Sequence, residues 1–239
     1  MGTEQSEQPG SLDSMMAADT EPPEIERLEA LDRDTITGLV RRSLEIDDAE
    51  ALEWRFERLQ GSFGFAGSIY RFHGTARHGG RTADWSLMLK VARPVWPGSE
   101  NPAHRAYWKR EWLAYESGFL NRLRGGIAAP RCFDAVEASD DECWLWLEEV
   151  DGELGTAWPV ERFGLAARHL GKFNAAYLGS GSWNRRPWLS RRFLRDWVAE
   201  SEDGIAKLPD CLDHPVVRTM FPGDLAQRAS SATTDSLLS

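Results

Sequence analysis

The spacing of apolar residues changes several times along the chain, and each change marks a predicted element. Residues 1–23 are rich in Gly, Ser, Glu, Pro and Met without apolar periodicity, so we expect a disordered tail there. A first helix is expected after Pro22-Pro23, and a second where Asp34 serves as N-cap to an apolar stripe at helical spacing. The stripe consists of Ile36, Leu39, Val40 and Leu44.

A period of two replaces the helical period after this stripe and predicts a β-rich region. Leu52, Trp54 and Phe56 alternate with charged residues, which is typical of a half-solvated strand. The remaining predicted strands lie around two polar turns, His78–Arg81 and Ser139–Glu142. These strands are Ser68–Phe72, Trp85–Arg93, Arg131–Val136 and Cys143–Leu147. The first three strands are expected to form an antiparallel meander.

In the strand Trp85–Arg93, apolar residues occupy both odd and even positions, and therefore both faces, which predicts a central strand covered on both faces. Lys90 is the one charge inside this run, and a buried ammonium group requires an anionic partner. The alternative is that the side chain of Lys90 extends to solvent from the end of the strand. A helix around Tyr107–Leu120 is expected to cross one face of the sheet and carries Glu111.

Helical spacing returns after the acidic segment that follows Cys143–Leu147. Pro159 is expected in the first turn of a helix with one apolar face, and a later helix around Phe193 is expected to close at Gly204. The apolar face comprises Phe163, Ala166, Ala167, Leu170, Phe173 and Tyr177. The domain division we predict is a 24–150 lobe, a 151–225 helical lobe that includes a short helix near Val216–Met220, and a 226–239 disordered tail.

Composition narrows the functional classes. The chain has 239 residues, 41% of them hydrophobic, which suffices for the core of one domain or two lobes. A net charge of −10 without a basic cluster argues against a nucleic-acid partner. No apolar run approaches the length of a membrane helix, the N-terminus lacks a signal-peptide pattern, and an odd count of three cysteines argues against a disulfide framework. We therefore expect a cytoplasmic protein without a membrane partner.

Three features in sequence order suggest a phosphate site. Gly61, Gly64 and Gly67 form a glycine-spaced turn whose backbone amides can approach phosphate without obstruction by a Cβ atom. Lys90 follows on a strand, and Glu111 follows on a helix. The alternatives are a plain glycine-rich hairpin and a solvated carboxylate at Glu111, and Glu116 is a weaker rival as the partner of Lys90.

The order of elements resembles the N-lobe, hinge and first C-lobe helices of the protein-kinase-like fold. The short sequence motifs within these elements resemble those of the aminoglycoside phosphotransferase family. The segments that carry this resemblance are Leu87–Lys90, Arg110–Tyr115, Ala129–Cys132, Trp146–Val150 and Ala166–Gly171. It covers roughly residues 50–220. It implies an α+β fold with a five-stranded antiparallel N-lobe and an incomplete helical C-lobe.

The resemblance also implies roles for individual residues. Lys90 would contact the α- and β-phosphates of ATP, and Glu111 would pair with Lys90 and hold it in place. The glycine turn would cover the phosphates. Glu148, Glu149 and Val150 would form the hinge whose backbone groups bind adenine. The family uses ATP and Mg²⁺ and phosphorylates a small hydroxyl-bearing substrate.

The catalytic part of the family pattern, H-x-D-x-x-x-x-N followed by a strand-borne Asp, is not found in the sequence. Asp224 has no histidine two residues before it and is followed five residues later by Ala229 instead of Asn. We therefore assign no catalytic residue and no magnesium ligand, and expect a kinase truncated before its catalytic loop and inactive as written. The competing hypotheses are a non-catalytic, pseudokinase-like module that binds a nucleotide or a partner, and a structural α+β protein that binds no nucleotide.

Overall fold

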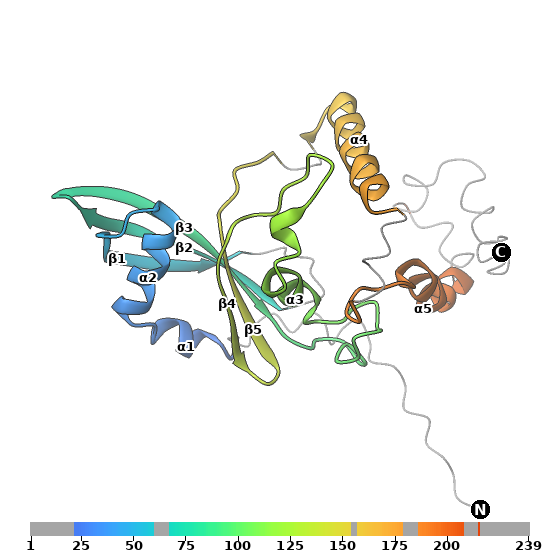
Figure 1. Ribbon diagram of the computed structural model, residues 1–239. Helices are drawn as coiled ribbons and strands as arrows, with labels where there is room; N and C mark the ends of the chain where they lie inside the picture. Colours follow the sequence, from blue (N-terminus) through green and yellow to red (C-terminus); the bar gives the residue numbers. More distant parts are fainter. Residues whose placement is uncertain (1–21, 60–66, 154–156, 179–185, 208–214, 216–239) are drawn as a thin grey trace, which may run out of the picture.

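The protein is an α+β structure built on one five-stranded antiparallel sheet with strand order β1-β2-β3-β5-β4 (Figure 1). The computed structural model describes residues 22–59, 67–153, 157–178, 186–207 and 215. Its strands are β1 (Glu50–Arg58), β2 (Ser68–His78), β3 (Arg81–Ala92), β4 (Cys132–Ser139) and β5 (Glu142–Leu147). Its α-helices are α1 (Ile25–Glu29), α2 (Arg33–Leu44), α3 (Arg110–Glu116), α4 (Val160–Tyr177) and α5 (Phe193–Lys207). The expected class and the five antiparallel strands are confirmed.

The β1-β2-β3 meander forms as expected, but β2 and β3 are longer than their apolar runs. Residues of β2 and β3 pair from Ser68 with Val91 to His78 with Arg81. The hairpin closes through Gly79 and Gly80, which both have positive φ angles, as a two-residue turn of this hand requires. Pairing between the strands therefore extends the ladder through a polar stretch in which local β-propensity is low.

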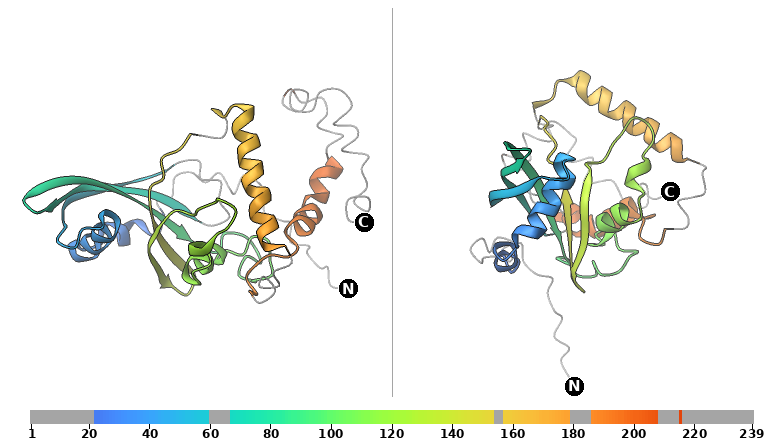
Figure 2. Two further views of the ribbon diagram at one scale, coloured as in Figure 1. Left: turned by 45° about the horizontal axis from the view of Figure 1, so that its top comes forward. Right: turned by 60° about the vertical axis from the view of Figure 1, so that its left-hand side comes forward.

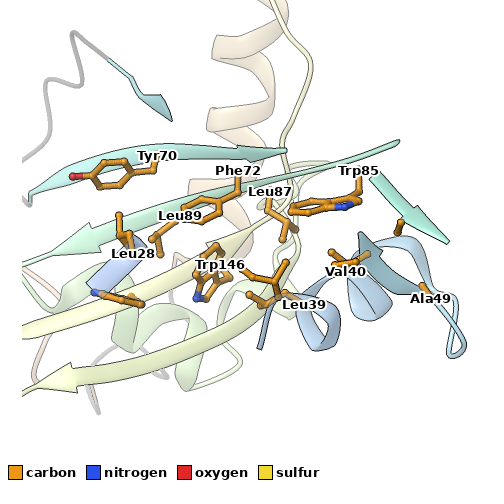
Figure 3. Close-up of a cluster of buried hydrophobic side chains, with 14 of the residues drawn as sticks. Leu28, Leu39, Val40, Ala49, Tyr70, Phe72, Trp85, Leu87, Leu89 and Trp146 are labelled. Atoms are coloured by element: carbon orange, nitrogen blue, oxygen red, sulfur yellow. The ribbon is translucent and has the colours of Figure 1, made fainter. Parts of the chain in front are cut away.

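Two hydrophobic clusters cover opposite faces of the sheet, because neighbouring residues of β5 contribute to different clusters. Helix α2 packs on one face, called here the α2 face, and Figure 3 shows its Leu39 and Val40 beside Phe72, Leu87 and Trp146. The other face, called here the α3 face, is covered at one end by the two tryptophans Trp108 and Trp112. These pack against β5, whose six residues are all buried. β3 is thus a central strand with cover on both faces, as predicted.

The helices correct several boundaries. Asp32, and not Asp34, is the N-cap of α2, because its side chain accepts a hydrogen bond of 2.7 Å from the backbone N–H of Thr35. Helix α3 covers only the middle of the expected Tyr107–Leu120, and the left-handed Gly118 follows directly on its C-cap. Pro159 is the N-cap of α4 and not part of its first turn. Helix α5 continues through Gly204 to Lys207, since a helix tolerates an internal glycine at modest cost.

Helices α4 and α5 stand beyond α3, away from the sheet (Figures 1 and 2). α4 contributes no buried residue, and Phe163 and Leu170 of its apolar face are about half exposed. Contacts near its C-terminal end hold it to the loop after α3: the Tyr177 ring lies 5.9 Å from that of Phe119, and His169 Nδ1 lies 3.0 Å from the carbonyl oxygen of Gly125. None of the helices in the described ranges is long and apolar enough to cross a membrane.

Several predictions from the sequence fall on residues outside the described ranges. These are the N-terminal tail up to residue 21, the glycines Gly61 and Gly64, the short helix near Val216–Met220 and the 226–239 tail.

A buried ionic network ties the start of the described chain to the sheet. Glu24 is fully buried; its carboxylate accepts hydrogen bonds from the Tyr70 hydroxyl at 2.8 Å and from Arg93 Nη2 at 2.7 Å. Arg93 also donates to Glu142 at 2.6 Å. Arg27 of α1 forms an ion pair with Glu142 as well. The four charges balance, and the two carboxylates are the buried ones, whereas Arg93 is partly and Arg27 largely accessible at the edge of the network.

Candidate functional site

The central feature of the site is an ion pair between Lys90 of β3 and Glu111 of α3. Lys90 Nζ lies 2.5 Å from Glu111 Oε2, across 21 residues of sequence. Lys90 pairs in register with Ile69 of β2 and Leu145 of β5, so its side chain leaves the middle of the sheet on the α3 face. The anionic partner expected for Lys90 is therefore present, and it is Glu111 and not the exposed Glu116 at the end of α3.

The pair is half exposed, with 26% of the Lys90 and 40% of the Glu111 side chain accessible. An ion pair of this exposure contributes on the order of 0.2–1 kcal/mol to stability. Its significance is therefore positional: it fixes α3 over the strand and holds an ammonium group at the surface of the sheet. Tyr115, one helical turn after Glu111, keeps its phenolic proton because burial, and then the nearby Glu111 charge, raise its pKa.

Gly67 is the one described glycine of the predicted loop, and it lies against the strand that carries Lys90. Its φ angle is +81°, and a Cβ atom placed on it would come within 2.0 Å of the carbonyl oxygen of Val91. Only glycine fits both the conformation and the space. The end of the loop thus contacts β3 one residue beyond Lys90.

The predicted hinge begins directly after β5. The backbone N–H of Glu148 donates to the Arg131 carbonyl at 2.9 Å, and its carboxylate accepts from the Arg131 N–H at 3.0 Å. This reciprocal pair commits the Glu148 backbone N–H inside the protein. Val150, at the end of the predicted hinge, is 62% exposed.

The Glu149 carboxylate is held by two residues of the α3 face that sequence reasoning did not single out. Arg71 of β2 bonds it at 2.8 and 3.0 Å, and Ser86 of β3 is a further hydrogen-bond partner. Burial raises the pKa of Glu149, but the hydrogen bonds of Ser86 and Arg71 outweigh it and the net pKa lies below the ordinary value. Arg71 could have been identified from the sequence in the same way as Lys90, because it is a single charge within an apolar stretch of strand.

A cavity of about 720 Å³ lies next to this hinge. β5 pairs only with Met88–Ala92, so the first half of β3 has an open edge in the described sheet, and the cavity surrounds it. Arg71, Ser86 and Glu149 line it from the α3 face, whereas Trp54, Trp85 and Phe133 of its lining belong to the hydrophobic cluster on the α2 face. Neither Lys90 nor Glu111 lines it. The site residues therefore fall into two groups, the ion pair and the hinge cavity.

The two groups lie along one strand. Ser86 borders the cavity and precedes Lys90 by four residues of β3, which corresponds to about 13 Å in a strand. Both side chains project from the α3 face, since residues two apart share a face. Within the described ranges, no cluster of three or more His, Cys, Asp or Glu side chains has the geometry of a metal site.

Comparisons of the chain with protein-family models, with curated proteins and with solved structures gave no match. Function is therefore argued from the residues and their geometry.

Proposed function

We propose that the chain binds ATP on the α3 face, as the nucleotide-holding part of a small-molecule kinase similar to aminoglycoside phosphotransferases. The observation that carries the proposal is the 2.5 Å contact between Lys90 and Glu111. It joins a lysine of a central strand to a glutamate of the following helix, which is the arrangement that phosphoryl-transfer enzymes of this kind use to present an ammonium group to phosphates.

The rest of the face accommodates the remainder of the nucleotide. With the phosphates at Lys90, the base is placed toward the hinge cavity, about 13 Å away along β3. Glu149 borders that cavity, and its backbone and that of the adjacent Val150 have hydrogen-bonding capacity for a base. Gly67 brings the end of the glycine loop against the strand beside Lys90.

The second candidate is a non-catalytic module that uses the same site. It is favoured by the missing H-x-D-x-x-x-x-N pattern, because without a base and carboxylates for magnesium the chain can hold a nucleotide but has no described means to transfer its phosphoryl group. Magnesium separates the candidates. A module without metal ligands binds ATP equally well with and without Mg²⁺, whereas a kinase site binds the magnesium complex more tightly.

Replacing Lys90 with alanine is expected to weaken ATP binding by about tenfold to a hundredfold, because hydrogen bonds to a charged group contribute about 1.5–3 kcal/mol. Isothermal titration of the purified chain with ATP measures the effect. Lys172→Ala, on the exposed surface of α4, is the matched control and should leave the affinity unchanged. Failure of the wild-type chain to bind ATP would contradict the proposal and favour the structural α+β protein, whereas equal binding by Lys90→Ala would show that ATP binds away from Lys90.

Two glutamates of the same helix test the pairing itself. Glu111→Gln removes the charge that holds Lys90 and is expected to weaken ATP binding by about fivefold, in line with the upper range for half-exposed ion pairs. Glu116→Gln makes the same chemical change at the exposed end of α3 and is expected to have no effect. The same titration measures both variants. An equal response of the two would mean that general charge, and not the contact with Lys90, governs affinity.

A further inference from the structure

Three consecutive charged residues at the start of α3 contact three different parts of the protein. Lys109 forms an ion pair with Glu137 of β4, and its ammonium group lies 4.9 Å from the Trp112 ring centre. Arg110 contacts two loops, and Glu111 contacts Lys90. Successive helical residues point about 100° apart. Three such contacts together determine the rotation of α3, and with it the direction of the Glu111 side chain.

Arg110 differs from its neighbours because backbone carbonyls hold it. Its Nε donates to the Trp188 carbonyl at 2.6 Å, Nη1 to that of Arg105 at 2.7 Å, and Nη2 to that of His104 at 2.8 Å. No carboxylate in the described part of the chain forms an ion pair with it. Burial lowers its pKa, but a guanidinium remains charged. The planar fork therefore locks the start of α3 to two loops with fixed geometry.

The distant loop is itself firmly seated. Trp188 is buried, and its ring meets that of Phe119, just after α3, edge to face at 6.4 Å. The Arg186 guanidinium lies 5.2 Å from the Phe119 ring centre and 5.6 Å from that of Trp188. Residues 186–189, called here the docked segment, therefore hold α3 at both ends: through the Arg110 guanidinium at its start and through Phe119 beyond its end.

We propose that Arg110 is a positioning residue that couples the docked segment to the Lys90–Glu111 pair. With the segment seated, Arg110 holds α3 in the rotation that brings Glu111 to Lys90. With the segment released, the Arg110 side chain loses one of its acceptors, α3 loses a constraint at each end, and Glu111 separates from Lys90. The consequence for ATP rests on the proposed function; the coupling between the segment and the pair does not.

The reactivity of Lys90 toward an acylating reagent tests the coupling in the absence of nucleotide. An acylating reagent must approach the amine nitrogen, and the 2.5 Å contact with Glu111 Oε2 covers one side of Lys90 Nζ. The chain has four lysines, so mass spectrometry of peptides after timed treatment with an N-hydroxysuccinimide acetate resolves each rate. In Arg110→Gln and in Trp188→Ala, Lys90 is expected to react about threefold faster. The rate of the exposed Lys172 should remain unchanged.

Arg192→Gln is the matched control, because it removes an exposed guanidinium close to the docked segment whose ion-pair partner is Asp196. It should leave the Lys90 rate unchanged. Circular dichroism identifies any unfolded variant. If Arg110→Gln unfolds, the Lys90 rate in Trp188→Ala, which keeps the Arg110 guanidinium, is the test of the coupling. An unchanged Lys90 rate in folded variants overturns the proposal.

ATP titration of the same variants keeps the two proposals apart. A faster Lys90 rate in a chain that binds no ATP would support the coupling and contradict the proposed function. ATP binding that depends on Lys90 but is unaffected by Arg110→Gln, together with an unchanged Lys90 rate, would support the function and contradict the coupling.

Discussion

Replacing Glu24 with alanine is expected to lower the free energy of unfolding by about 3 kcal/mol. The carboxylate is fully buried and accepts hydrogen bonds from Tyr70 and Arg93. Its removal leaves the network with one excess positive charge and the buried Tyr70 hydroxyl without this acceptor. The loss lies at the low end of the range for a broken buried pair because Arg93 keeps Glu142. Urea denaturation followed by tryptophan fluorescence measures it.

Glu29→Ala is the control for this measurement. Glu29 is an exposed residue of helix α1, whose N-cap is Glu24, and its substitution should change stability by no more than about 0.5 kcal/mol. A similar loss in both variants would mean that helix α1, and not the buried network, determines the effect.

The stability difference between wild type and Glu24→Ala should also depend on pH. Burial raises the pKa of Glu24, but hydrogen bonds, above all that from Tyr70, and the charge of Arg93 lower it, and the net pKa lies below the ordinary 4.5. A carboxylate with a lowered folded-state pKa stabilises the fold above its ordinary pKa and loses this contribution as the pH falls through the folded-state value. The difference should therefore be largest near neutral pH and narrow in acid below pH 4.5.

The sheet could be predicted from the sequence because its signals are local. The alternation at Leu52–Phe56 and the apolar run at Cys143–Leu147 each define a strand by residues within it. The single charge of Lys90 predicted a partner, and the sequence offered Glu111 and Glu116 as candidates. The sequence favoured Glu111, and the structure shows that contact; the rotation of α3 that makes it possible is not a property that a sequence pattern gives.

The features that could not be predicted depend on register or on contacts between distant segments. Asp32 and Asp34 fit the start of the α2 stripe about equally well, and only backbone geometry selects Asp32 as the N-cap. The contact of Arg71 with Glu149 joins residues 78 apart and requires the strand order to be known. The contact between Arg27 and Glu142 spans 115 residues. Periodicity reports which face a residue occupies, and not which distant residue meets it there.

Substituting Gly67 is expected to affect both the fold and the site. A Cβ atom at Gly67 meets the Val91 carbonyl oxygen at 2.0 Å, and the φ angle of +81° adds strain for any other residue. The strain costs about 1–2 kcal/mol and the steric overlap about 1–3 kcal/mol, so Gly67→Ala should lose about 3 kcal/mol of unfolding free energy. Urea denaturation measures the loss.

A substitution at Gly80 distinguishes the strain of a positive φ angle from the steric overlap of an added Cβ atom. Its φ angle of +77° is nearly the same, but a Cβ atom there meets nothing within 4 Å. Gly80→Ala should therefore cost only the strain, about 1 kcal/mol. Val91 directly follows Lys90, so relief of the overlap in Gly67→Ala displaces the strand end that carries the ammonium group. ATP affinity should then fall about tenfold in Gly67→Ala and stay unchanged in Gly80→Ala. Equal losses of stability would contradict the steric argument, whereas unchanged ATP binding in a folded Gly67→Ala variant would show that this loop end serves the sheet and not the nucleotide.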